Sequence, residues 1–89
     1  MIKVKISESD PTILVFDGEI LECFFVDGSK RFHVTHIKGF QFESNNQAKH
    51  LLTIKLEEDP ILVWVDESAV AKVKELIAEV LKATASFKL

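Results

Sequence analysis

The spacing of apolar side chains changes once along the chain, at Asp66, and this change limits the folds that the chain can adopt. Before Asp66, apolar side chains recur at every second position, as in half-buried β-strands. After it, they recur with the 3.6-residue period of an amphipathic helix. The sequence therefore predicts an antiparallel β structure that ends in one C-terminal helix.

Seven short strands are expected before the helix. In residues 2–6 Ile and Val alternate with Lys, and residues 50–57 show the clearest inward and outward alternation. Asp-Gly pairs at 17–18 and 27–28 are typical of tight hairpin turns, which join antiparallel strands. The expected strands are residues 2–6, 12–16, 19–26, 30–34, 37–43, 50–57 and 61–65.

The helix is expected over about residues 67–83, with residues 84–89 as a frayed tail. Asp66 or Ser68 can cap its start. A small antiparallel sheet that curls has to cover its open end, and this helix is the available cover. The expected apolar stripe consists of Ala69, Val70, Val73, Leu76, Ile77, Val80, Leu81 and Thr84.

We therefore expect residues 1–89 to form one domain of the mainly-β, α+β class. About seven antiparallel strands would form a barrel or sandwich, capped by the C-terminal helix. The chain length permits one modest hydrophobic core.

Composition excludes several classes of function. The chain has 11 basic and 14 acidic residues and a net charge of -3, so it lacks the positive excess of nucleic-acid-binding proteins. No apolar run reaches the length of about 18 residues that a transmembrane helix needs. The N-terminal MIKVKIS lacks the apolar stretch of a secretory signal. Because Cys23 is the single cysteine, no internal disulfide can form, and we expect a cytoplasmic protein.

A basic segment between Ser29 and Phe40 is a candidate binding surface, because it contains no acidic residue. Alternation along a strand places Lys30 and Arg31 on opposite faces, so the whole set cannot converge on one ligand. Such side chains are most often simply solvated. The candidates are Lys30, Arg31, His33, His36 and Lys38.

Two of these candidates, His33 and His36, also raise the question of a metal site. A closed zinc site needs about four ligands, and no cysteine or acid lies near them in sequence. His50 and Cys23 could join them only through the fold. We expect structural histidines, with no metal and no cofactor.

Catalysis is not expected. Cys23 shares a strand face with Leu21 and Phe25, as a buried cysteine does, whereas a nucleophilic cysteine needs an electropositive and partly open setting. The sequence contains no glycine-rich phosphate loop, nucleophile elbow or acid–base pair of carboxylates. An enzyme that used Cys23 or histidine chemistry is the least favoured alternative.

Apolar side chains on both faces of two expected strands indicate an interaction surface. Adjacent strand residues point to opposite faces, so Phe24 points outward if Phe25 is in the core. Within residues 61–65, ILVWV, one of the two alternating sets stays outside unless the helix and loops cover both. Exposed apolar patches usually mark interfaces. The candidate interface residues are Phe24, Leu62, Trp64 and Phe87.

The order of elements resembles the pleckstrin homology (PH) superfold, and the length is similar to that of short bacterial PH-like domains. TILVFDGEILECFF resembles their opening hairpin, and KRFHVTHIKGFQFE resembles a basic strand followed by His-Ile and a further strand. ILVWVDESAVAKVKELIAEVLKA resembles their final strand and capping helix. The resemblance covers most of the chain and implies a binding module rather than an enzyme.

The chain departs from the PH pattern where many of these domains bind phosphoinositides. In those domains the phosphoinositide is bound by Lys and Arg side chains around the loop between the first two strands. Here the loop is either the acidic SESDP, residues 7–11, or the tight turn at 17–18. The resemblance therefore implies protein contacts or homo-oligomerisation. The alternative is weak binding of acidic phospholipid or phosphorylated ligands through residues 30–38.

Overall fold

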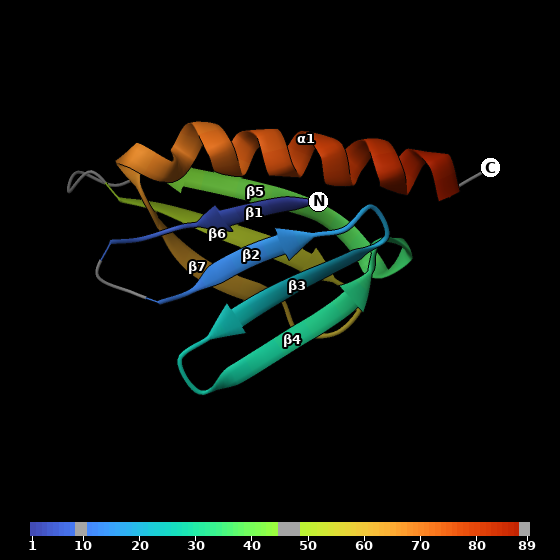
Figure 1. The fold of residues 1–89 in the computed structure, drawn as a ribbon. Coiled ribbons are helices and arrows are strands. Elements are labelled where there is room, and N and C mark those ends of the chain that lie inside the picture. Colours follow the sequence, from blue (N-terminus) through green and yellow to red (C-terminus); the bar gives the residue numbers. More distant parts are fainter. Residues whose placement is uncertain (9–10, 45–48, 88–89) are drawn as a thin grey trace.

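Two antiparallel β-sheets and one C-terminal helix make up the computed structural model, which describes residues 1–8, 11–44 and 49–87 (Figure 1). The predicted mainly-β fold with a C-terminal helix is confirmed. The strands are β1 (Ile2–Lys5), β2 (Ile13–Phe16), β3 (Ile20–Phe25), β4 (Gly28–His33), β5 (Ile37–Ser44), β6 (Lys49–Leu56) and β7 (Ile61–Asp66). Two 3-10 turns, η1 (Val34–His36) and η2 (Glu67–Ala69), precede β5 and the helix α1 (Val70–Phe87), respectively.

The two sheets leave one side of the molecule uncovered by strands. One sheet has the order β1-β2-β3-β4 and the other the order β5-β6-β7. The chain passes from the first sheet to the second through η1, and the Asp66 N–H donates to the Ile6 carbonyl at 2.8 Å, which links the end of β7 to the segment after β1. Helix α1 contacts β1 and β5 and covers that side. No described strand pairs with the outer edge of β4.

The side chain of Asp17 shapes the first hairpin. Its Oδ1 accepts hydrogen bonds from the backbone N–H groups of Ile20 at 2.8 Å and Glu19 at 2.9 Å. These bonds stabilise the carboxylate and lower the pKa of Asp17. Gly18 follows with φ 110, a backbone conformation that favours glycine.

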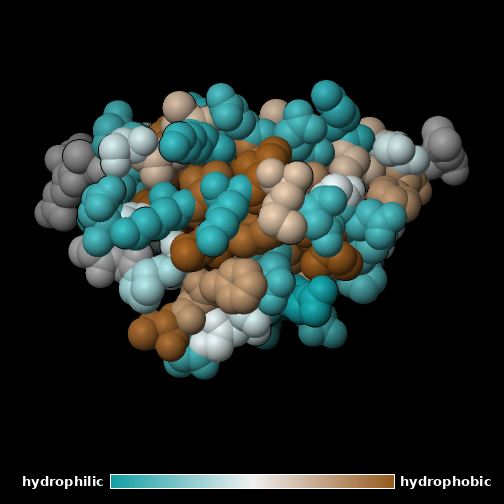
Figure 2. Space-filling model, viewed as in Figure 1, coloured by the Kyte–Doolittle hydropathy of each residue, from teal (hydrophilic) through white to brown (hydrophobic). Residues whose placement is uncertain are grey.

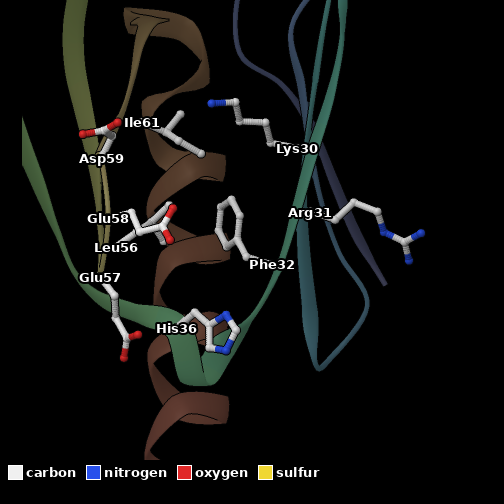
Figure 3. A pocket seen from close by; sticks show the side chains of 9 residues that line it. All are labelled: Lys30, Arg31, Phe32, His36, Leu56, Glu57, Glu58, Asp59 and Ile61. Carbon is white, nitrogen blue, oxygen red and sulfur yellow. The ribbon is translucent and has the colours of Figure 1, made fainter.

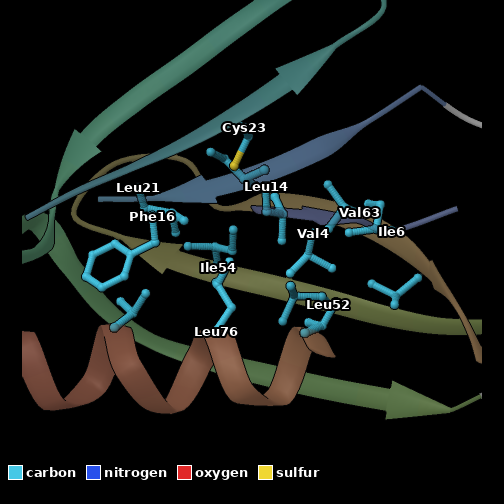
Figure 4. Packing of buried hydrophobic residues seen from close by; sticks show 14 of the residues in the cluster. Val4, Ile6, Leu14, Phe16, Leu21, Cys23, Leu52, Ile54, Val63 and Leu76 are labelled. Atoms are coloured by element: carbon cyan, nitrogen blue, oxygen red, sulfur yellow. The ribbon is translucent and has the colours of Figure 1, made fainter. Parts of the chain in front are cut away.

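One cluster of buried side chains lies between the two sheets and α1 (Figure 4). Leu14 and Leu21 from the first sheet meet Leu52 and Ile54 from the second, and all four are completely buried. Leu76 of α1 closes the cluster and is 1% exposed. Full burial of one such side chain contributes about 1.5–3 kcal/mol, so this contact between sheets and helix is a main source of stability.

Helix α1 differs from the prediction at its C-terminal end. The predicted frayed tail is wrong for residues 84–87, which continue the helix to Phe87; residues 88–89 lie outside the described part of the chain. Thr84 is buried and its Oγ1 donates to the Val80 carbonyl at 2.8 Å, so its hydroxyl is satisfied inside the core. Leu81, expected in the apolar stripe, is 48% exposed. No described helix is long and apolar enough to cross a bilayer.

Candidate functional site

A cleft of about 490 Å³ lies between β4 and the connection from β6 to β7 (Figure 3). Apolar side chains from three strands line it: Phe32 of β4, Leu56 at the end of β6 and Ile61 at the start of β7. Ligand-binding clefts commonly have volumes of about 300–1,000 Å³. The remaining lining residues are Lys30, Arg31, His36, Glu57, Glu58 and Asp59.

Strand β4 forms the basic wall of this cleft. Lys30 lies opposite the buried Cys23 in the β3–β4 register, so the two side chains point to the same, inner face of the sheet. Lys30 and Phe32 are directed into the cleft, whereas the Arg31 side chain is directed away from it. On the outer face, Arg31 Nε lies 3.8 Å from Glu22 Oε1.

The connection from β6 to β7 forms an acidic wall. Glu57 Oε1 lies 3.3 Å from Lys38 Nζ, so this carboxylate is paired. Glu58 and Asp59 have no ion-pair partner among the described residues, and neither has Lys30. The cleft therefore carries two unpaired carboxylates on one wall and one unpaired ammonium on the other.

The five candidates of the basic segment are not brought together. Lys30 and His36 line the cleft, Arg31 lies on the outer face, and Lys38 pairs with an acid at the rim. His33 Nδ1 lies 2.9 Å from Thr35 Oγ1, and its ring packs edge-on against Phe87 with centroids 4.9 Å apart. An anion in the cleft would face the carboxylates of residues 57–59. Binding of acidic lipid or phosphorylated ligands through this segment stays a prediction.

Two of the apolar candidates lie side by side on the outer face of the three-stranded sheet. Leu62 is 56% and Trp64 51% exposed, while the alternate residues Ile61, Val63 and Val65 are buried. Trp64 lies opposite Leu51 in the β6–β7 register, and Leu62 lies opposite Thr53. Leu51, Leu62 and Trp64 form what we call the outer β7 patch.

The other two apolar candidates lie elsewhere. Phe24 is on the outer face of the four-stranded sheet, near the tip of the β3–β4 hairpin, where Val26 is 83% exposed. Figure 2 shows hydrophobic side chains gathered at this tip. Phe87 is 46% exposed and packs on one side against His33. The predicted interface residues are therefore spread over three places.

His50 takes part in a polar network that the sequence did not reveal. Its Nδ1 lies 2.9 Å from Ser44 Oγ, and its Nε2 contacts the Glu67 carboxylate. These are the residue types of a hydrolytic triad, but the Glu67 side chain is 67% exposed, whereas the acid of such a triad is buried. The network connects β5, β6 and η2, and we interpret it as structural.

Metal and thiol chemistry find no support in the described geometry. No three His, Cys, Asp or Glu side chains in residues 1–8, 11–44 and 49–87 are grouped so that they could hold a metal ion. Cys23 is completely buried, and this burial raises the pKa of its thiol to about 12. A thiol with such a pKa is protonated near neutral pH and is a poor nucleophile.

No protein-family model matches the chain, and comparisons with curated proteins and with solved structures return no match. The cleft and the outer β7 patch are therefore the features from which a function can be argued.

Proposed function

We propose that the chain is a non-enzymatic interaction module of PH-like architecture that acts through protein contacts. The contact proposed here is a homodimer, in which the partner is a second copy of the chain. The outer β7 patch carries this proposal, because two large apolar side chains lie together and each is more than half exposed. Contiguous exposed apolar surface usually marks an interface, and tryptophan is enriched among the residues that dominate binding. The arrangement of four and three antiparallel strands with a C-terminal helix supports the PH-like part.

The charges around the outer β7 patch favour a symmetric pair. Glu43 lies opposite Leu51, and Lys55 lies four residues further along the same face of β6. Glu43 thus lies beside Leu51 on β5, and Lys55 lies at the end of the patch next to Thr53, while the other end carries the Lys49–Asp66 ion pair. A two-fold axis that passes through the patch and runs across the strands would bring Glu43 of one copy towards Lys55 of the other, which is the self-complementary arrangement that such dimers need.

The expected contribution of Trp64 to the free energy of dimerisation follows from its exposed area. A tryptophan side chain can bury up to about 250 Å², so half of it corresponds to about 125 Å², or about 3 kcal/mol at 25 cal/mol per Å². The two copies in a dimer would together contribute about 6 kcal/mol as an upper limit. Half of this limit, about 3 kcal/mol, corresponds to about a hundredfold in the dissociation constant, and we expect Trp64→Gln to weaken dimerisation by about that factor.

Sedimentation equilibrium of the wild type and two variants tests the proposal. The wild type should dimerise at micromolar concentration, and Trp64→Gln should be monomeric there. Val26→Gln removes an even more exposed apolar side chain from a different face, so it should dimerise like the wild type. A monomeric wild type at about 100 μM, or equal weakening by both variants, would refute self-association through the outer β7 patch.

A further inference from the structure

The cleft between β4 and the β6–β7 connection is separate from the outer β7 patch, because it is lined by the inner-face residues Lys30 and Phe32 and by Ile61, which is on the buried face of β7. We propose that this cleft binds an extended peptide segment of another protein, in which an apolar and a basic side chain are two residues apart.

The edge of β4 explains why the peptide is extended. Among the described strands β4 pairs with β3 alone, so within this part of the chain its outer edge has backbone N–H and C=O groups without a strand partner. An extended peptide can pair with such an edge, and pockets beside the edge then select alternate side chains. Here the pocket beside the edge is the cleft itself, to which β4 contributes residues 30–32.

The charges of the cleft select a basic side chain. Glu58 and Asp59 are free of ion pairs within the described residues, and an opposite charge is what such carboxylates attract. Lys30, on the opposite wall, is more than the ion-pair distance of 4.0 Å from both, since no salt bridge joins them. Its ammonium can donate to a backbone carbonyl of the peptide. An acidic peptide would instead meet two unpaired carboxylates.

The apolar lining sets the spacing of the peptide side chains. Phe32, Leu56 and Ile61 offer a surface for one aliphatic side chain, next to the carboxylates of Glu58 and Asp59. In an extended chain, side chains two residues apart point to the same side, about 6.6 Å from each other. An apolar residue and a Lys or Arg, separated by one residue of any type, is therefore the pattern that fits.

Titration of two capped peptides into the isotope-labelled full chain, followed by amide NMR shifts, tests this inference. The probes are acetyl-TTVTKTT-amide and acetyl-TTVTETT-amide, which differ only in one charge. The lysine peptide should shift the amides of β4 and of residues 56–61 with a Kd below about 1 mM, and the glutamate peptide should bind at least about tenfold more weakly. Equal binding, shifts outside the cleft, or no binding of the lysine peptide would overturn the inference.

A variant that removes the two carboxylates of the cleft, compared with a matched control, identifies the contact. Glu58→Gln combined with Asp59→Asn should weaken binding of the lysine peptide about tenfold and reduce its dependence on salt. Glu75→Gln combined with Glu79→Gln removes the same charge from the exposed side of α1 and should leave the Kd unchanged. Equal weakening by both double variants would reduce the effect to net charge and refute a specific contact.

The two proposals can fail separately. The same titration in the Trp64→Gln background measures peptide binding without the outer β7 patch. Peptide binding with an unchanged Kd in that background supports two independent sites. Loss of binding only there would mean that the cleft depends on the dimer, which contradicts the inference of a separate site.

Discussion

Replacement of Leu76 by Ala should destabilise the chain much more than replacement of Leu81 by Ala. Both residues lie on α1, but Leu76 is 1% exposed within the core cluster and Leu81 is 48% exposed. Truncation of a fully buried Leu costs about 2–5 kcal/mol, because the removed atoms leave a cavity. Full burial of a Leu side chain is worth about 1.5–3 kcal/mol, so the half-buried Leu81 should cost about 1 kcal/mol. The change in helix propensity is the same at both positions and cancels in the comparison.

Urea unfolding, followed by circular dichroism, measures both changes. A chain of 89 residues is expected to have a free energy of unfolding of about 4–13 kcal/mol, so Leu76→Ala removes a large share of it. The unfolding midpoint should fall strongly for Leu76→Ala and slightly for Leu81→Ala, with the same denaturant slope. Equal losses in the two variants would show that α1 packs against the sheets through a different side.

Two further predictions concern ionisable groups. The backbone N–H of Glu8 and then the ammonium of Lys49, both at 2.9 Å, lower the pKa of Asp66. Because the folded pKa lies below the unfolded value of about 3.9, ionised Asp66 stabilises the fold above that pH, and this contribution is lost as the pH falls through the folded pKa. Thermal unfolding should therefore show a stability advantage over Asp66→Asn at pH 7 that shrinks below about pH 4; a pH-independent difference would contradict this. The Cys23 thiol should react slowly with iodoacetamide in the native chain and at the rate of a free thiol in denaturant, and rapid native alkylation would contradict its burial.

Most of the strands were predictable because one face of each is buried; β4, in which no residue is buried, is the exception. Leu52 and Ile54 of β6 lie on either side of the polar Thr53 in the sequence, and both are completely buried. The same rule separates Leu62 and Trp64 from the buried residues of β7. Turn positions were less certain: the second hairpin loop is formed by residues 26–27, one residue earlier than the Asp-Gly pair indicates, since Gly28 already pairs with Phe25.

Features that depend on contacts between distant segments could not be read from local patterns. The last turn of α1 packs through Thr84 and the contact of Phe87 with His33, a residue of β4. The acidic EEDP stretch has the sequence pattern of a turn, and only the meeting of the two sheets places Glu58 and Asp59 across from β4. The three neighbouring acids in the sequence indicated an acidic surface. Nothing in the local pattern indicated that this surface faces β4.

The inward direction of Lys30 also affects how copies of the chain can meet. The peptide inferred above places one apolar side chain in the cleft, whereas a continuous apolar strand from another copy, aligned along the outer edge of β4, would cover this ammonium with apolar side chains and deprive it of water without supplying a counter-charge. Charged side chains that point inward from an outermost strand are a known protection against aggregation of β-proteins. A single lysine can thus keep the unpaired edge of β4 from recruiting identical neighbours into growing fibres.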